Sequence, residues 1–189
     1  VFCVLNKMDQ ENIDYFKAIE NIKRNFSVPL VPFTIPIGEG EKFNGIVDIL
    51  KKTAFTYNSD SKTGTKIELD QNLKEVAESK YNSLVEDVVE NDEALLEKYL
   101  NGEEIDIDNL NTVLRRSVIN RSIIPVFAIS AGKNIGIDIL MDYINSLLPS
   151  PLETSKRDAL EINSKNRVEI NPSNENQLAA YVFKTMADP

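Results

Sequence analysis

The sequence contains no histidine, no tryptophan and only one cysteine, Cys3, among its 189 residues. These absences exclude the usual serine- and cysteine-protease dyads, a zinc site built from cysteine and histidine, and a disulfide within the chain. The longest apolar runs, such as 123–129, are far shorter than the ~20 residues that cross a bilayer, and no basic-then-apolar leader opens the chain. We therefore expect a soluble, cytoplasmic protein with no membrane association.

What is present is the composition of an ordinary globular protein with one unusual charge distribution. Apolar residues make up 42% of the chain and charged residues 27%, which is enough for a hydrophobic core. The formal net charge is -9. Between Asp70 and Asp108 the chain carries 13 acidic residues and three bases, whereas the remainder is close to neutral.

Strand and helix patterns alternate at both ends of the chain. The runs 1–5 and 123–129 are continuously apolar, which is typical of strands buried on both faces of a parallel sheet. Three- and four-residue spacing of apolar residues predicts amphipathic helices, which we place at 12–26, 73–88, 94–99, 110–118 and 137–148.

The middle of the chain has a different pattern. Prolines restrict 28–37 to irregular or edge strands, a second β-like stretch covers 45–57, and the polar run 58–65 is typical of a hairpin tip. Asn101-Gly102 predicts the end of a helix, with a residue in the left-handed backbone conformation as its C-terminal cap. Either Asp106 or Asp108 begins the next helix.

This order predicts an α/β fold in which a mixed α+β insertion interrupts a parallel-sheet domain. We expect the sheet domain to comprise 1–27 and 122–151, the insertion 28–121, a linker 152–165, and the start of a second domain 166–189. Because the chain opens inside an apolar run with a residue other than Met, we also expect it to be part of a longer polypeptide.

Two short polar motifs directly follow the two apolar strands. Asn6-Lys7-Met8-Asp9 comes after the first strand and Ser130-Ala131-Gly132-Lys133 after the second. Each motif alone is a weak signal, because Asn, Asp and Ser are common at turns and helix caps. In matching positions, however, the motifs would lie together at the carboxyl ends of parallel strands, where open α/β sheets bind their ligands.

The side chains of these motifs suit the recognition of guanine. Asp9 can accept hydrogen bonds from the N–H and the amino group on one edge of guanine, which adenine does not present. Asn6 can connect the two turns, the stems of Lys7 and Lys133 can cover the faces of the ring, and the Ala131 N–H can donate to the exocyclic oxygen. Losing the Asp9 contact would leave polar groups unpaired, at roughly 1–3 kcal/mol each, or about tenfold to hundredfold in affinity.

The two motifs resemble the guanine-recognition motifs of the translational GTPases, and the chain as a whole resembles bacterial elongation factor G or one of its paralogues. Further matching stretches are Ile35-Pro36-Ile37-Gly38, Phe43-Asn44-Gly45-Ile46-Val47-Asp48, Lys98-Tyr99-Leu100, Pro125-Val126-Phe127, Leu148-Pro149-Ser150-Pro151-Leu152 and 179–189. The resemblance implies the C-terminal part of a P-loop GTPase-type parallel-sheet domain, with an inserted subdomain, followed by the first strand of a β-barrel domain.

For the complete protein, the resemblance implies GTP or GDP with magnesium as cofactors, the ribosome as partner, and GTP hydrolysis that promotes translocation or ribosome recycling. It assigns nucleotide binding in this chain to Asn6, Lys7, Asp9, Ser130, Ala131 and Lys133, and it assigns no catalytic or metal-binding residue. The sequence has no G-x-x-x-x-G-K-[ST] phosphate loop. The resemblance places this loop and the magnesium ligands upstream of Val1, so we do not expect these residues alone to hydrolyse GTP.

The acidic stretch has two interpretations. It is either a solvated outer face, or, as the resemblance implies, part of a subdomain that contacts the ribosomal stalk protein, with Glu75, Glu78 and Glu86 attracting that partner electrostatically. Direct nucleic-acid contact through this face is disfavoured, because phosphates would be repelled.

Gly132 departs from the family pattern, in which a bulkier apolar residue is frequent. It is either the variation of a paralogue or an altered loop that changes nucleotide affinity, and together with Gly38-Glu39-Gly40 it favours a paralogue. A function of another class also remains open, namely a non-catalytic α/β protein-interaction module with relic nucleotide motifs. A phosphate loop upstream in the encoding reading frame would favour the GTPase, and a start codon at Val1 would favour the module.

Overall fold

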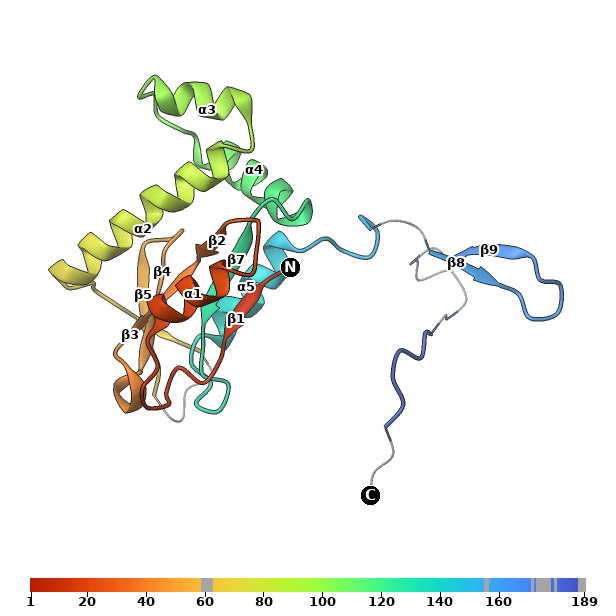
Figure 1. Cartoon of the computed structure of the whole chain (residues 1–189), viewed down its shortest axis with the longest axis horizontal. Helices are drawn as coiled ribbons and strands as arrows, with labels where there is room; N and C mark the ends of the chain where they lie inside the picture. Colours follow the sequence, from red (N-terminus) through yellow and green to blue (C-terminus); the bar gives the residue numbers. More distant parts are fainter. Residues whose placement is uncertain (59–62, 155–156, 171, 173–177, 179, 187–189) are drawn as a thin grey trace. The chain divides into compact units, whose positions relative to one another are not determined.

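The computed structural model of the chain describes residues 1–58, 63–154, 157–170, 172, 178 and 180–186 (Figure 1). The chain divides into two compact units, Val1–Leu148 and Pro149–Pro189. The first unit contains a parallel sheet, an antiparallel sheet and five α-helices among its described residues, and the second contains a short hairpin. The finer division of the sequence into sheet domain, insertion, linker and second domain stays a prediction.

A three-stranded parallel sheet lies at the centre of the first unit. β7 (Ile124–Ala128) is its middle strand and pairs in parallel with β1 (Cys3–Leu5) and with β2 (Leu30–Pro32). All of β7 is buried, as its apolar run predicts. β1 is an edge strand in the described part of the chain, and Val4 is 39% exposed. The expectation that both faces of this strand are buried is therefore wrong, because Val4 on one face is exposed and Cys3 and Leu5 on the other are only half-buried.

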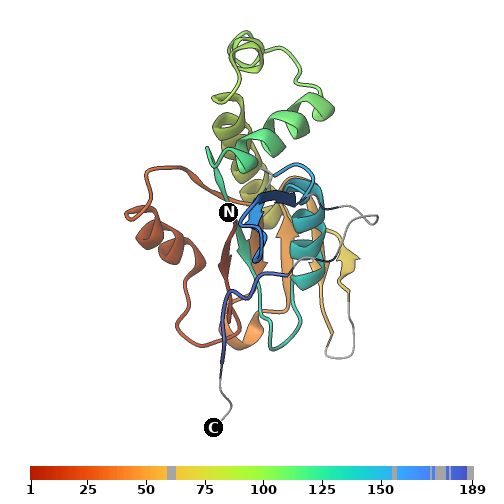
Figure 2. The same ribbon diagram turned by 90° about the vertical axis from the view of Figure 1, so that its right-hand side faces the viewer.

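One helix lies on each side of this sheet (Figure 2). α1 (Tyr15–Lys23) connects β1 to β2 and begins at Asp14, whose side chain accepts a hydrogen bond from the backbone N–H of Lys17 at 2.9 Å. α5 (Ile137–Leu147) follows β7. Both helices bury an apolar stripe and expose their polar residues, as the spacing of their apolar residues predicts.

A four-stranded antiparallel sheet extends the core. Its order is β3 (Thr34–Ile37), β4 (Gly45–Asp48), β5 (Thr53–Thr56) and β6 (Thr65–Ile67), with the short 3-10 helix η1 (Gly40–Lys42) between β3 and β4. Both β2 and β3 are edge strands, as their prolines predict. The predicted hairpin tip lies largely at 59–62, outside the described residues.

Phe33 joins the two sheets. It separates β2 from β3, is fully buried, and donates its N–H to the carbonyl of Val126 in β7 at 2.9 Å. Its own carbonyl accepts from the N–H of Ile49, directly after β4, at 2.9 Å. The inserted sheet therefore packs against the parallel sheet within one continuous core.

Three further helices follow β6, namely α2 (Gln71–Val89), α3 (Glu93–Leu100) and α4 (Ile107–Ile119). Each begins at an aspartate whose carboxylate accepts a hydrogen bond from a backbone N–H three residues later, and these aspartates are Asp70, Asp92 and Asp106. Of the two candidates left open by the sequence, Asp106 is the one that caps α4. Gly102 has φ +71 after α3, which confirms the predicted helix end.

The second unit contains β8 (Arg157–Leu160) paired antiparallel with β9 (Arg167–Ile170). β8 lies inside the stretch 152–165 that we expected to be a linker, so this stretch contains a strand that the sequence analysis did not predict. The strand expected over 179–184 lies partly outside the described residues, and residues 180–186 have no regular secondary structure. The start of a β-barrel domain at 166–189 stays a prediction.

Candidate functional site

The two polar motifs lie side by side at one edge of the parallel sheet. β1 and β7 are adjacent and parallel, and their pairing ends at Leu5 and Ala128, so both chains leave the sheet at the same end (Figure 1). Just beyond the strands, Ile129 donates its N–H to the carbonyl of Leu5 at 3.0 Å, and Met8 donates its N–H to the carbonyl of Ile129 at 3.1 Å. These bonds hold the first turn, 6–10, against the second, 130–135.

The first turn is bent so that its polar residues stay at the sheet edge. Lys7 has φ +65, in the left-handed region that is uncommon for residues other than glycine. The N–H of Gln10 donates to the Lys7 carbonyl at 3.0 Å and closes the turn. Met8 is 3% exposed and anchors the turn in the core, which leaves Lys7 and Asp9 on the outside.

Asn6 connects the two turns directly. Its Oδ1 accepts hydrogen bonds from the backbone N–H of Ala131 at 3.0 Å and from that of Lys7 at 2.7 Å. The contact between the turns that we expected from Asn6 is therefore present. The Ala131 N–H, which we expected to face the exocyclic oxygen of a base, donates to Asn6 here, so a bound base would have to share this donor.

The carboxylate of Asp9 is held in its charged, hydrogen-bond-accepting form. A hydrogen bond from the side chain of Ser130 is the main cause of its lowered pKa, and Gln10 and Lys133 add to the effect. The Gln10 Nε2 lies 3.2 Å and the Lys133 Nζ 4.0 Å from Asp9 Oδ2. The Asp9 side chain keeps 13% of its surface exposed, so it is both oriented and accessible.

Ser130 orders the second turn. Its side chain is fully buried, and its Oγ accepts the backbone N–H of Lys133 at 3.2 Å. Ser130 and Ile135 exchange two backbone hydrogen bonds, of 3.1 and 2.9 Å, which close the turn. Gly136 follows with φ +76, and a Cβ there would lie 3.0 Å from the Ala128 carbonyl oxygen. The turn therefore leads into α5 through a position that favours glycine.

The lysines and Gly132 border the edge where a planar base would lie. The Lys7 side chain is exposed, and that of Lys133 is 46% exposed, so both stems are free to cover a ring. A Cβ at Gly132 would meet nothing within 4 Å. The position therefore has open space for a Cβ.

The arrangement as a whole presents one charged acceptor flanked by two cations. A carboxylate acceptor is suited to a flat heterocycle that carries adjacent N–H donors. The structure thus brings together Asn6, Lys7, Asp9, Ser130, Ala131 and Lys133, the six residues that we selected from the sequence. Their role in nucleotide binding stays a prediction.

The acidic residues Glu75, Glu78 and Glu86 lie elsewhere, on α2. Each already accepts a hydrogen bond within the chain: Glu75 from Gln71 at 2.9 Å, Glu78 from Lys52 at 3.0 Å, and Glu86 from the Tyr99 hydroxyl at 2.9 Å. They are surface residues whose charge faces solvent and which are not part of the site at the sheet edge.

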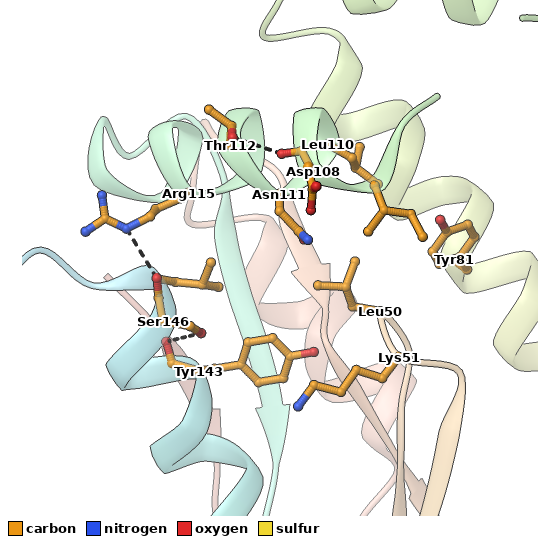
Figure 3. Close-up of a pocket in the computed structure, with 12 residues that line it drawn as sticks. Leu50, Lys51, Tyr81, Asp108, Leu110, Asn111, Thr112, Arg115, Tyr143 and Ser146 are labelled. Carbon is orange, nitrogen blue, oxygen red and sulfur yellow. Dashed lines mark hydrogen bonds between the residues drawn. The ribbon is translucent and has the colours of Figure 1, made fainter. Parts of the chain in front are cut away.

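A groove of about 760 Å³ lies between α2, α4, α5 and the β4–β5 turn (Figure 3). None of the residues of the two turns lines it. Its cationic groups have partners in the chain, since Lys51 Nζ lies 3.6 Å from Asp48 Oδ2 and Arg115 Nε donates to the Ser146 carbonyl at 3.2 Å. We therefore place the candidate site at the sheet edge.

Sequence patterns did not single out two residues beside the second turn, Tyr57 and Asp138. The Tyr57 hydroxyl donates to Asp138 Oδ1 at 2.6 Å, although the two residues are 81 positions apart. No local pattern signals such a pair, because the contact depends on how the insertion packs against α5.

Two curated proteins match the chain over nearly its whole length. It is 35% identical over 188 residues to an elongation factor G-like protein of Thermotoga maritima, a match that covers 100% of this chain and 26% of that protein. It is 37% identical over 186 residues to elongation factor G 2 of Syntrophomonas wolfei, with coverage of 98% and 27%. The chain is similar throughout to elongation factor G. No family model matches it.

The resemblance to elongation factor G inferred from the motifs is thereby confirmed, and it supports a translational GTPase family. The chain spans about a quarter of the length of these curated relatives. A crystal structure of a Thermus thermophilus protein has the same fold, with a TM-score of 0.72 and 26% identity, over 89% of this chain and 26% of that one. Together with the observed parallel sheet, this neighbour confirms the predicted α/β class.

The part of the chain that the structure describes forms neither a metal-binding cluster nor a membrane-spanning helix. No group of three or more acidic, cysteine or histidine side chains there is arranged to hold a metal ion. No helix there combines the length and the apolar character needed to cross a bilayer.

Proposed function

We propose that this chain forms the guanine-reading part of the GTP site in a ribosome-associated GTPase of the elongation factor G type, one that promotes translocation or ribosome recycling. The observation that carries the proposal is the junction of the two motifs. Asn6 accepts the N–H of Ala131 at 3.0 Å, and Lys133 Nζ lies 4.0 Å from Asp9 Oδ2, so residues more than 120 positions apart form one polar edge.

In this proposal Asp9 recognises the base. Its carboxylate accepts from the ring N–H and the exocyclic amino group of guanine, and the stems of Lys7 and Lys133 cover the two faces of the ring. Adenine presents no such pair of donors, so binding it would leave the charged carboxylate without its partners. The selectivity therefore rests on a single side chain, that of Asp9.

The residues of this chain fit the guanine base of GTP or GDP but not the phosphates or magnesium. The sequence contains no phosphate-binding loop, and the described residues offer no metal-binding cluster. Hydrolysis depends on positioning and charge around the phosphates. We therefore assign base recognition to this chain, and phosphate chemistry to other parts of an elongation factor G-type protein.

The decisive experiment is a base-swap titration of the chain. Backbone amide NMR spectra are recorded while GDP, XDP or ADP is added to the native chain and to Asp9→Asn. The native chain should prefer GDP, with shifts at 6–10 and 130–135. Asp9→Asn should weaken GDP binding at least about tenfold and favour XDP, whose carbonyl edge suits an amide donor.

Two results would contradict the proposal. One is equal binding of GDP and ADP by the native chain, and the other is an unchanged preference for GDP in Asp9→Asn. Absence of any nucleotide-dependent shift at the two turns would favour the interaction module with relic motifs. Glu90→Gln on α2 is a suitable control, because it removes one exposed carboxylate outside the two turns.

The acidic face of α2 supplies the second part of the proposal, namely contact with the ribosomal stalk protein. Glu75, Glu78 and Glu86 occupy exposed or half-exposed positions on one long helix, where their charges act on an approaching basic partner over about a Debye length. Nucleic acid is a disfavoured partner for this face, because its phosphates have the same sign of charge.

A further inference from the structure

The second turn is attached to the inserted sheet through one carboxylate, that of Asp138. Asp138 is the second residue of α5 and follows Ile135, the last residue of the turn, by three positions. Its Oδ1 accepts the hydroxyl of Tyr57 at 2.6 Å, and its Oδ2 accepts the N–H of Gly64 at 2.8 Å. Tyr57 directly follows β5 and Gly64 directly precedes β6. Both oxygens of the carboxylate are thus occupied by the insertion.

The surroundings of this carboxylate leave little room for movement. Tyr57 is 7% exposed, and a Cβ on Gly64 would lie 2.8 Å from Cζ of the Tyr57 ring. Burial raises the pKa of Tyr57, and the Asp138 carboxylate raises it further, so the hydroxyl stays protonated and continues to donate near neutral pH. The contact is therefore a fixed one in the folded chain.

A short and closely packed path leads from Asp138 to the base-reading residues. Gly136 packs its backbone against the carbonyl of Ala128 in β7. Ile135, 3% exposed, is bonded on both sides to Ser130. Ser130 Oγ accepts the backbone N–H of Lys133 at 3.2 Å, and Lys133 Nζ lies 4.0 Å from Asp9 Oδ2. A shift at the start of α5 would move Ile135, then Ser130, and then Lys133 beside Asp9.

The insertion also borders the second turn directly. A groove of about 470 Å³ is lined on one side by residues 132–135 of the turn, and on the other by Phe43, Asn44, Tyr57 and Asn58 of the insertion. The Tyr57 ring is therefore both a partner of Asp138 and a wall next to Lys133. The insertion therefore contacts the second turn in two ways, through the hydrogen bond to Asp138 and through the wall of this groove, and Tyr57 takes part in both.

We propose that Tyr57 and Asp138 are positioning residues for guanine nucleotide binding, through which the inserted sheet sets the position of the turn at 130–135. The inference rests on the proposed function and extends it to residues outside both motifs. Neither side chain touches the base. They act through Ile135 and Ser130, and the affinity for a guanine nucleoside diphosphate depends on the contact between them.

The test is Tyr57→Phe, which removes the hydroxyl and keeps the ring. Titration with GDP by amide NMR, well below the unfolding temperature of the variant, should show about three- to tenfold weaker binding. Hydrogen exchange at the Ile135 amide, which donates to Ser130 at 2.9 Å, should accelerate in the nucleotide-free protein. Asp138→Asn should weaken GDP binding in the same direction, because one carboxylate acceptor is replaced by a donor.

Tyr99→Phe is the matched control. Tyr99 also donates its hydroxyl to a carboxylate, that of Glu86 at 2.9 Å, but on α3 and away from both turns. This variant should bind GDP like the native chain. A lower unfolding temperature in Tyr57→Phe with unchanged GDP affinity would show a purely structural role and overturn the inference.

The two proposals fail in different ways. If Asp9→Asn changes the preference from GDP to XDP while Tyr57→Phe and Asp138→Asn bind GDP normally, the positioning role is wrong and base recognition stands. If Asp9→Asn leaves the preference unchanged, base recognition itself is wrong.

Discussion

Asp9 and Asp48 are two carboxylates whose surroundings shift the pKa in opposite directions. The Ser130 hydrogen bond lowers the pKa of Asp9. Burial raises the pKa of Asp48, which is fully buried and accepts the Tyr143 hydroxyl at 2.7 Å. Among the described residues no hydrogen bond reaches Asp48 Oδ2, and only the Lys51 Nζ lies near it, at 3.6 Å. Asp9 is therefore free to serve a ligand, whereas Asp48 depends on its protein partners.

We expect Tyr143→Phe to destabilise the fold by about 1–3 kcal/mol at pH 7, because it leaves a buried carboxylate with one donor fewer. The native pKa of Asp48 lies above its ordinary value of 3.8. The contribution of this group to stability therefore falls as pH rises from about 4 through the native pKa. The hydrogen bond from the Tyr143 hydroxyl lowers the pKa of Asp48 and so opposes the effect of burial. Tyr143→Phe should raise this pKa further, and the loss of unfolding free energy that it causes should therefore grow from pH 4 to pH 7.

Urea unfolding followed by circular dichroism at several pH values measures this effect. Tyr99→Phe serves again as the control, since Glu86 lies at the surface and its loss of one donor should change stability by at most about 0.5 kcal/mol. A destabilisation by Tyr143→Phe that is the same at pH 4 and pH 7 would contradict the role assigned to Asp48.

At the scale of elements, the three helices of the insertion share one way of beginning. Asp70, Asp92 and Asp106 each place a carboxylate on a backbone N–H at the start of a helix. Such caps satisfy donors that the helix itself leaves unpaired, and their negative charge interacts favourably with the positive end of the helix dipole. Each cap therefore adds to the stability that its helix gains from packing.

Asp106→Ala should therefore destabilise the protein by about 0.5–2 kcal/mol. The control lies two residues further on. Asp108 is in the first turn of α4 but does not cap it, so Asp108→Ala should lose only the weaker dipole interaction, about 0.3–1 kcal/mol. Thermal unfolding of both variants compares them directly, and a larger effect at Asp108 would disprove the assignment of the cap.

Most elements follow from local sequence, and the exceptions have identifiable causes. Caps, prolines and apolar spacing predict α1 to α5 and the edge positions of β2 and β3, because these signals act within a few residues. The exposure of Val4 and the strand at 157–160 were not predicted. The first depends on which faces of β1 other elements cover, and the second on pairing with β9 across a turn.

At the scale of the whole molecule, charge and candidate site are separated. α3 and α4 lie at the end of the first unit opposite the two turns (Figure 1). The acidic excess between Asp70 and Asp108 lies on α2, α3, α4 and their connections, whereas the candidate site combines Asp9 with Lys133 and the exposed Lys7. A basic partner would therefore be attracted to these helices and not to the candidate site.

Reversal of Glu75, Glu78 and Glu86 to Lys should slow association with the isolated stalk protein at low salt, by about tenfold. The difference from the native chain should shrink as ionic strength rises, because exposed charges are screened. Stopped-flow association rates at several salt concentrations measure it. Equal association rates of the variant and the native chain at low salt would leave solvation as the only role of these residues. As a control, a GDP titration of the variant that matches the native one would show that the site at the sheet edge is intact.

The sequence by itself determined the α/β alternation, the helix caps and the six residues at the sheet edge. These features depend on residues that are adjacent in the chain or that follow strands directly, and parallel pairing of β1 with β7 necessarily brings the ends of those strands together. Only the tertiary structure decided that the Ala131 N–H donates to Asn6 and that Tyr57 holds Asp138. These contacts depend on how the insertion and the two turns pack in three dimensions, because residues distant in sequence interact only once the core is formed.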